Sequence, residues 1–354
     1  MATPSRRKLI RPGDKADQLA AFAEAALAAA REAERHTAAT RLDISVAEIP
    51  IRLELCGDTL ASIGIAALSG LRSENAHTAA RIWAFDTETS GLEPPPPPWG
   101  RDAYRPRDAL AVEAPEWLEI SYGLVPGCLN LFDRHERTGV FWMHDARRLP
   151  GWQRTTPLRS LLRSVARRHD AWMLHAAAVA NDRAAVLISG RGGSGKSTTA
   201  IGCAIAGIEC LGDDVCIVRD DRVYPLYGIA KAEPRTVALL SLDRHHAIIG
   251  GDDLGRAHLR IADLGPPWRS EGRPVVAVVV PQVSAPAGRL RPLNAAAAVL
   301  ACGPSTALEI TGNGQAEMRF VASLLQRTPA YELGTGGDLT RVVGAISNLL
   351  EGVR

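Results

Sequence analysis

The feature that most constrains the fold of this 354-residue chain is the stretch LISGRGGSGKSTTAIG, residues 187–202. Residues 190–197 match the pattern G-x-x-x-x-G-K-[ST] at every fixed position. A short apolar run, AAVLIS, comes before the match, and a helix-forming run that ends at Gly207 comes after it. A strand, a glycine-rich loop and a helix in this order place backbone amides and a helix N-terminus around bound phosphate groups. The pattern therefore predicts an α/β domain with a nucleotide-binding loop.

Each residue type in this loop has a chemical role. The glycines let the backbone turn its amides inward, because they have no Cβ to clash. Lys196 is expected to bridge the β- and γ-phosphates of ATP, and Ser197 to offer its hydroxyl to Mg²⁺. The predicted nucleotide-binding residues are Gly190, Arg191, Gly192, Gly193, Ser194, Gly195, Lys196, Ser197 and Thr198. ATP and Mg²⁺ are the expected cofactors.

A carboxylate pair follows the loop helix, in the stretch IECLGDDVCIV, residues 208–218. Residues 208–211 are predicted to form a short strand that carries Asp213 and Asp214 at its carboxyl end. Ligands of α/β sheets bind at that edge, so we expect both carboxylates to face the nucleotide phosphates. Two adjacent carboxylates suit a kinase, since one can hold the metal or its waters while the other accepts the proton of an attacking hydroxyl.

The chain has two other Asp-Asp pairs, Asp220-Asp221 and Asp252-Asp253. Both lie in turn-like sequence, where we expect solvated loop carboxylates. The first pair lies in VCIVRDDRVYPL, which predicts an antiparallel hairpin around residues 219–222. A hairpin at this place argues against a simple doubly wound parallel sheet.

His175 lies just upstream of the loop, in WMLHAAAVANDRAAVLISG. Its small neighbours predict a strand, which the turn over residues 181–183 would pair with the strand that enters the loop. A lone histidine in apolar sequence is usually a core residue, but one hairpin away from the phosphates a functional role is favoured. The predicted catalytic residues are therefore Asp214, Asp213, His175 and Lys196.

His175, the phosphate loop and the aspartate pair, at these separations, resemble the catalytic domain of HPr kinase/phosphorylase, mainly over residues 174–226. The resemblance implies a mixed-sheet α/β fold of the kind shared with phosphoenolpyruvate carboxykinases. It also implies that Lys196 and Ser197 bind phosphate and Mg²⁺, that Asp214 accepts the proton, and that His175 lies in the active site. The predicted Mg²⁺ ligands are Ser197 and Asp213. The glycine-rich signature that follows the aspartates in HPr enzymes has no counterpart here.

A closer resemblance is to the stand-alone HPr-kinase-like proteins of peptide natural-product pathways, especially those of lasso peptides. Trp83, Asp86, residues 94–99 and the segment Tyr227–Lys231 carry this resemblance. Such kinases phosphorylate a serine hydroxyl at the C-terminus of a ribosomally made precursor peptide. The resemblance thus implies a phosphotransferase with an alcohol acceptor and a precursor peptide as partner.

Two basic residues after the aspartates are candidate substrate ligands. Lys231, one of only four lysines, is predicted to contact a phosphate or a substrate carboxylate, and the alternative is an ordinary surface lysine. Arg235 is a further candidate. Two other functions stay open: a kinase of another protein or of a small-molecule hydroxyl, and a regulator that binds ATP without transferring phosphate. The aspartate pair favours an enzyme, since a binding module needs no base.

Composition limits the partners. The formal net charge of +2 gives no reason to expect nucleic acid or a membrane surface. No window approaches the roughly 18 apolar residues of a membrane span, and the N-terminus lacks the apolar region of a secretory signal. The six cysteines show no CxxC pair or metal-ligand spacing, as in a reduced cytoplasmic protein. The resemblance to the HPr enzymes, which are oligomers, also implies a possible homo-oligomer.

The chain is predicted to divide into three parts: a tail and Ala-rich helix (1–40), an α+β N-terminal domain (41–150), and the P-loop HPr kinase-like catalytic domain (151–354), with a boundary near residues 149–157. Five consecutive prolines, residues 94–98, exclude helix and central strand, so we expect a polyproline II linker or rim segment. The expected elements of the N-terminal half are helices over 17–40, 58–75 and 157–170, strands over 47–57 and 80–89, and a hairpin over 128–146.

Overall fold

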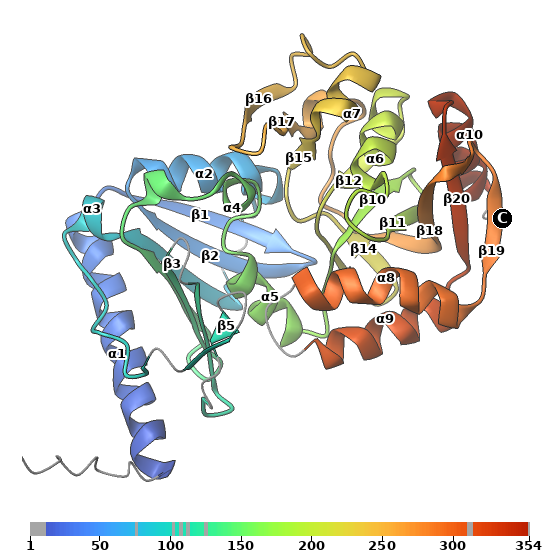
Figure 1. Ribbon diagram of the computed structural model, residues 1–354. Helices are drawn as coiled ribbons and strands as arrows, with labels where there is room; N and C mark the ends of the chain where they lie inside the picture. The colour runs from blue at the N-terminus through green and yellow to red at the C-terminus, as the bar shows by residue number, and fades with distance from the viewer. Residues whose placement is uncertain are drawn as a thin grey trace, which may run out of the picture.

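The computed structural model describes residues 12–74, 77–100, 103–105, 109–110, 114–123, 127–309 and 314–352. It shows a mixed α/β protein with two main sheets, one in each half of the chain (Figure 1). Within these ranges, no helix combines the length and the apolar character that crossing a bilayer requires.

The first sheet has six strands in the order β1-β2-β3-β8-β7-β6. It is mixed, because β2, β3 and β8 run parallel to one another while the other neighbours are antiparallel. The two expected strands and the hairpin are confirmed, except that the strand expected over 80–89 ends at Asp86, where a short helix begins. The strand β1 was not expected, and only its first two residues overlap the helix predicted over 17–40. The strands are β1 (Ala39–Val46), β2 (Ile49–Cys56), β3 (Ala80–Asp86), β6 (Leu118–Gly123), β7 (Cys128–Asp133) and β8 (Thr138–Met143), beside a ribbon of β4 (Tyr104–Arg105) and β5 (Ala109–Leu110).

Helices cover both faces of this sheet. The alanine-rich α1 (Pro12–His36) buries Leu19, Phe22 and Ala26 on one face, against Trp83 and Phe85. The helices α2 (Asp58–Leu68) and α5 (Arg159–Arg167) cover the other face. The short elements between them are η1 (Ser69–Leu71), α3 (Thr87–Ser90), η4 (Ala146–Arg148) and α4 (Gly151–Thr155). The proline run over residues 94–98 forms neither helix nor strand, as expected.

The second sheet has nine strands, and seven of them follow the order β12-β10-β11-β18-β14-β13-β9. The other two are β20, which pairs with β18, and β19, which pairs with β20. The sheet is mixed, since β11, β18 and β20 are parallel and the hairpin β13–β14 is antiparallel. The strands are β9 (Trp172–Leu174), β10 (Ala176–Ala180), β11 (Ala185–Ser189), β12 (Glu209–Gly212), β13 (Cys216–Arg219), β14 (Arg222–Tyr224), β18 (Arg273–Pro286), β19 (Leu290–Leu293) and β20 (Ala330–Gly336).

Two pairs of helices enclose the second sheet. The helices α6 (Lys196–Ile205) and α10 (Leu339–Glu351) pack on one face of the sheet. They contact the strand residues Val179, Val186 and Ile188. The helices α8 (Ala295–Glu309) and α9 (Gln315–Arg327) pack on the other face. A three-stranded sheet of β15 (Ile229–Ala232), β17 (Ala257–Arg260) and β16 (Ile248–Gly251) lies beside α6, with α7 (Pro234–Leu239) and η5 (Ile261–Asp263).

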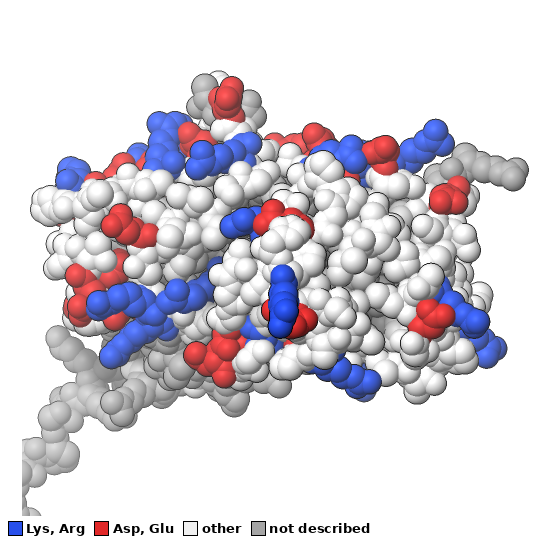
Figure 2. Space-filling view, turned by 90° about the horizontal axis from the view of Figure 1, so that it is seen from above, with Lys and Arg blue, Asp and Glu red and all other residues white. Residues whose placement is uncertain are grey.

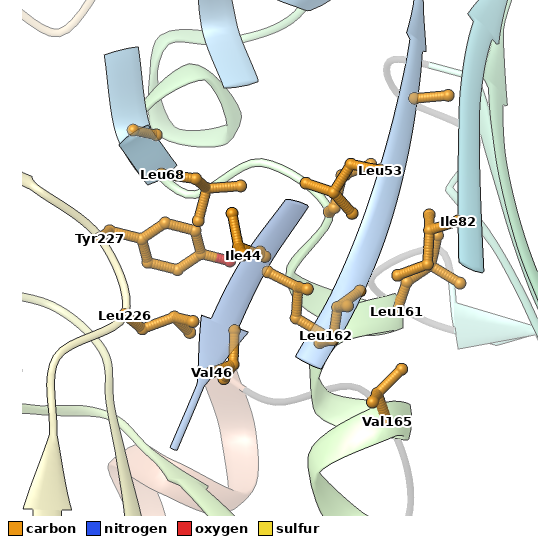
Figure 3. Close-up of a cluster of buried hydrophobic side chains, with 14 of the residues drawn as sticks. Ile44, Val46, Leu53, Leu68, Ile82, Leu161, Leu162, Val165, Leu226 and Tyr227 are labelled. Carbon is orange, nitrogen blue, oxygen red and sulfur yellow. The ribbon is translucent and has the colours of Figure 1, made fainter. Parts of the chain in front are cut away.

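One hydrophobic cluster joins the two halves of the chain. It contains Ile44 of β1, Leu162 of α5, and Leu226 and Tyr227, which precede β15 (Figure 3). Ile44, Leu162 and Leu226 are fully buried. The predicted domain boundary over residues 149–157 contains α4 and leads directly into α5. The start of α5 is therefore held between the two sheets.

The surface charge is mixed. On the face shown in Figure 2, basic and acidic side chains are interspersed between wide uncharged areas. Such a distribution produces a weak field, because opposite charges close together cancel at a distance. It agrees with the formal net charge of +2.

Candidate active site

The phosphate loop connects β11 to α6, so the predicted order of strand, loop and helix is confirmed. Gly193 and Gly195 have φ values of +75° and +102°, a region that side chains with a Cβ rarely adopt. Gly195 also begins α6 without a side-chain cap, which leaves the first amides of the helix available to a ligand. Gly207 closes the helix in the left-handed conformation (φ +91°), as predicted.

The lysine of the loop is held by the loop's own backbone. The Nζ atom of Lys196 donates hydrogen bonds to the carbonyl oxygens of Gly190 (3.0 Å) and Arg191 (3.2 Å). Its side chain is buried, so the ammonium cannot be relocated far from the loop without a change in the packing around it. Lys196 is thus a fixed positive charge at the base of the loop.

Three buried oxygens around the loop have no hydrogen-bond partner within the described part of the chain. They are Ser194 Oγ, Thr335 Oγ1 on β20, and Asp213 Oδ1. A Cβ placed on Gly195 would lie 3.7 Å from Thr335 Oγ1, which shows how closely β20 approaches the loop. Buried polar atoms are normally paired, so this group of atoms fits a polar ligand such as a nucleotide phosphate with its cation.

Asp213 lies directly after β12, at the carboxyl end of the strand, as predicted. Its Oδ2 atom accepts a hydrogen bond from the backbone amide of Lys231 at 2.9 Å. Burial, and after it the charge of Asp214, raise the pKa of Asp213. A hydrogen bond with the Ser197 hydroxyl lowers the same pKa by a smaller amount. A second charged group such as Mg²⁺ would stabilise its ionised form.

Asp214 is held between two basic side chains. Its Oδ2 atom lies 2.7 Å from Lys231 Nζ, and its Oδ1 atom lies 3.4 Å from His175 Nδ1. Burial by itself would raise the pKa of Asp214, but the charges of Lys231 and His175 outweigh it and lower the pKa to about 2. The two neighbouring aspartates therefore have different protonation behaviour, and Asp214 is the one held ionised.

His175 lies at a bend between β9 and β10, which corrects the expectation that it lies within a strand. Its amide donates a hydrogen bond to Thr306 Oγ1 on α8 at 3.3 Å. The bend lets one run of chain pair first with β13 and then with β11 and β12. The structure thus brings His175 to the aspartate pair, as the sequence predicted.

Lys231 and Arg235 differ in their environments. The Lys231 side chain is only 11% exposed and bonds to Asp214, so it is not an ordinary surface lysine. Arg235 lies exposed on α7. That helix is tied to the loop helix by a 2.7 Å hydrogen bond between the hydroxyls of Thr198 and Thr236.

Trp83 and Asp86 have structural positions in the N-terminal half. The Trp83 indole donates a 2.6 Å hydrogen bond to Glu34 of α1. The Asp86 carboxylate caps α3 by accepting from the amide of Thr89 at 3.0 Å. Both residues therefore stabilise the first sheet and its helices.

The two remaining aspartate pairs have different environments, and one expectation about them was wrong. Asp220 and Asp221 form the exposed turn of the β13–β14 hairpin, as predicted. Asp252, in contrast, has a side chain that is only 3% exposed. It pairs with Arg256 at 2.7 Å and accepts from the amide of Leu254, because the turn after β16 folds back over it.

Two further residues of the site gave no signal in the sequence. They are Thr306 on α8 and Thr335 on β20, and they lie far along the chain from the loop. Within the described ranges, no cluster of three or more His, Cys, Asp and Glu residues forms a metal site. Mg²⁺ in nucleotide sites needs only one or two protein ligands, because phosphate and water complete its coordination, so Ser197 with Asp213 is sufficient.

The low pKa of Asp214 predicts a pH-dependent effect on stability. Its folded-state pKa of about 2 lies below the ordinary value of 3.8, so the ionised carboxylate stabilises the fold above pH 4, and this is lost as the pH falls towards 2. We expect Asp214→Asn to lower the free energy of unfolding by about 2 kcal/mol at neutral pH. This difference in the free energy of unfolding between the variant and the wild type should disappear as the pH falls towards 2.

Denaturant unfolding of both proteins over a series of pH values measures this difference. Asp213 has a raised pKa and contributes with the opposite sign. Because the charge of Asp214 is one cause of that raised pKa, Asp214→Asn also relieves part of it, which makes the measured deficit smaller. A deficit that stays constant down to acidic pH would show that Asp214 stabilises the fold through packing and not through its charge.

Comparison with known proteins adds no relative for this site. No protein-family model matches the chain, and no curated protein matches it. A functional assignment therefore depends on the geometry of these residues and on the sequence resemblance.

Proposed function

We propose that this protein is an ATP-dependent kinase that transfers the γ-phosphoryl group to a hydroxyl group of its acceptor. The observation that carries the proposal is the convergence of a phosphate loop with an ionised carboxylate. Lys196 and Ser197 belong to the loop, and Asp214 lies beside it, held by Lys231 and His175. A site that only bound nucleotide would have no need of a second, buried carboxylate held in its charged form.

The residues divide into a nucleotide side and an acceptor side. Bound Mg·ATP supplies the transferable phosphoryl group. Ser197 and Asp213 would hold the Mg²⁺, and Lys196 with the loop amides would neutralise phosphate charge. Ser194 and Thr335 provide the unpaired hydroxyls that fit the same ligand.

On the acceptor side, Asp214 orients the attacking hydroxyl and takes up its proton. A carboxylate with a low pKa is a weak base, but phosphoryl transfer passes through a loose transition state in which positioning contributes more than early proton removal. Lys231 and His175 fix the carboxylate in place. The proposal therefore assigns positioning roles to Lys231 and His175.

The sequence resemblance supports a narrower form of the proposal. A mixed sheet, with an antiparallel hairpin after the aspartate pair, agrees with an HPr kinase-like catalytic domain. The resemblance to lasso peptide kinases supports a precursor peptide that ends in serine as the acceptor. We propose this peptide hydroxyl as the natural substrate.

The test uses the purified protein, Mg·ATP and two matched precursor-type peptides, one ending in serine and one in alanine. We expect the intact mass of the serine peptide alone to increase by one or more phosphoryl groups, and Asp214→Asn to abolish this gain. Transfer to a different hydroxyl acceptor would retain the kinase and reject the peptide. ATP binding without transfer to any hydroxyl acceptor would contradict the proposal and favour a nucleotide-binding regulator.

A further inference from the structure

Asp252 is a buried carboxylate that the proposed function does not use. Its side chain is 3% exposed and accepts from Arg256 Nε at 2.8 Å, from the Leu254 amide at 3.0 Å and from the Arg256 amide at 3.1 Å. Helix α4 covers this turn so closely that a Cβ placed on Gly151 would lie 2.2 Å from Asp252 Cβ. Asp252 is therefore a fixed support for the side chain that packs against it.

The side chain that packs against Asp252 is His258 on β17. It is 10% exposed, and its Nε2 atom lies 3.7 Å from Asp252 Oδ2, too far for a hydrogen bond. Within the described part of the chain, Nε2 has no hydrogen-bond partner. Burial lowers the pKa of His258, although the charge of Asp252 acts in the opposite direction, so the ring is uncharged at neutral pH. A buried polar ring without a hydrogen bond costs stability, and its place calls for a physical reason.

His258 lies directly across from Lys231. The antiparallel register of β15 and β17 pairs these two residues. The Lys231 amide donates to Asp213, so it points away from β17 and the pair is of the non-hydrogen-bonded kind. In such pairs the Cα atoms are about 4.5 Å apart and both side chains lie close together on the same face of the sheet. The His258 ring therefore packs beside the Lys231 side chain.

The small sheet thus places Lys231 between the aspartate pair and the histidine. The strand order is β15-β17-β16, so His258 lies on one side of β15. Asp213 and Asp214 lie on the other side, where the Lys231 amide reaches Asp213 and Lys231 Nζ lies 2.7 Å from Asp214. Lysine has a flexible stem, which does not by itself fix the direction of the ammonium. The His258 ring fills the space into which this stem would otherwise turn.

We propose that His258, supported by Asp252, is a positioning residue that confines the Lys231 side chain to the side of β15 where Asp214 lies. Without the ring, the Lys231 ammonium would leave Asp214 for part of the time. The carboxylate would then lose one of the contacts that fix it towards the acceptor hydroxyl. This inference rests on the proposed function, because it takes Asp214 as the group that orients the acceptor.

The first test observes Lys231 without nucleotide or acceptor, by NMR of protein that carries isotope-labelled lysine. The chain has only four lysines, so Lys231→Arg assigns the side-chain signal by its loss. Asp214→Asn shows where this signal lies when the charged partner is absent. We expect His258→Ala to shift the Lys231 signal towards the position found in Asp214→Asn. His258→Phe, which fills the space with a ring but has no ring nitrogen, should keep it close to the wild-type position.

The matched control is His144→Ala, which removes an imidazole from a side chain that is 62% exposed. It should leave the Lys231 signal unchanged. A wild-type Lys231 signal in folded His258→Ala would overturn the inference, because His258 would then serve the fold alone. So would a signal in His258→Phe that is shifted as far as in His258→Ala, because the ring would then not act by filling the space beside Lys231.

A second measurement separates this inference from the proposed function. With an acceptor that the wild type phosphorylates, His258→Ala should lower kcat about 10- to 100-fold, as for a misplaced catalytic group, without a change in ATP affinity. In the Asp214→Asn background the same substitution should cause no further loss, because residues that act as a unit are not additive. Unchanged kcat in His258→Ala would reject the positioning role and retain the kinase. Failure of the wild type to phosphorylate any acceptor, with the NMR shifts as expected, would reject the kinase and retain the contact.

Discussion

Replacement of Asp214 by asparagine is expected to lower the turnover number of phosphate transfer by about 10²- to 10⁴-fold, the range for loss of a positioned general base. Asparagine keeps the size of the side chain and an oxygen that can accept from Lys231, but it cannot take up a proton. The affinity for ATP should change little, because the proposed function assigns this carboxylate to the acceptor and not to the nucleotide. Steady-state kinetics with an acceptor that the wild type phosphorylates measure the turnover number. Titration of both proteins with ATP measures the affinity for ATP.

The control for this variant is Asp221→Asn, which removes a carboxylate from an exposed hairpin turn. It should leave both quantities unchanged. If Asp214→Asn kept more than a tenth of wild-type turnover, the carboxylate would serve only to hold Lys231. The base would then have to be sought among other groups near the loop.

The second large effect is expected from Lys196→Met. Methionine retains the length of the buried apolar stem and removes the ammonium that lies on the Gly190 and Arg191 carbonyls. Loss of one such electrostatic contact to the transferred group is expected to lower kcat/KM by about 10²- to 10³-fold. ATP binding should weaken as well, because the same charge meets the phosphates before the reaction.

The matched control is Arg244→Met, which removes one positive charge from a side chain that is 95% exposed. Kinetics and calorimetric titration with Mg·ATP test both variants. Unchanged ATP affinity and turnover in Lys196→Met would contradict the assignment of residues 190–197 as a phosphate loop. Thermal unfolding of each variant shows whether a loss of activity reflects a loss of folded protein.

The sequence predicted the centre of the site well because its determinants are local. The phosphate loop, the strand before it and the helix to Gly207 lie in one short stretch, where glycine spacing and apolar periodicity decide the structure. The bend at His175 is one hairpin away from the loop along the chain, and the aspartates after β12 are one helix away from it. The expectation for Asp252 failed because its burial depends on a turn that folds back over it, which a dipeptide pattern does not show.

Only the tertiary structure decided how the aspartates are charged and what surrounds them. Lys231 comes from a different sheet, and Thr335 comes from the strand β20. The pKa of Asp214 depends on burial and on charges a few ångströms away, and neither quantity can be read from residue order. The sequence by itself determined that this chain has a strand, a glycine-rich loop with a lysine, and a helix, with carboxylates nearby. Packing determined which carboxylate is held ionised.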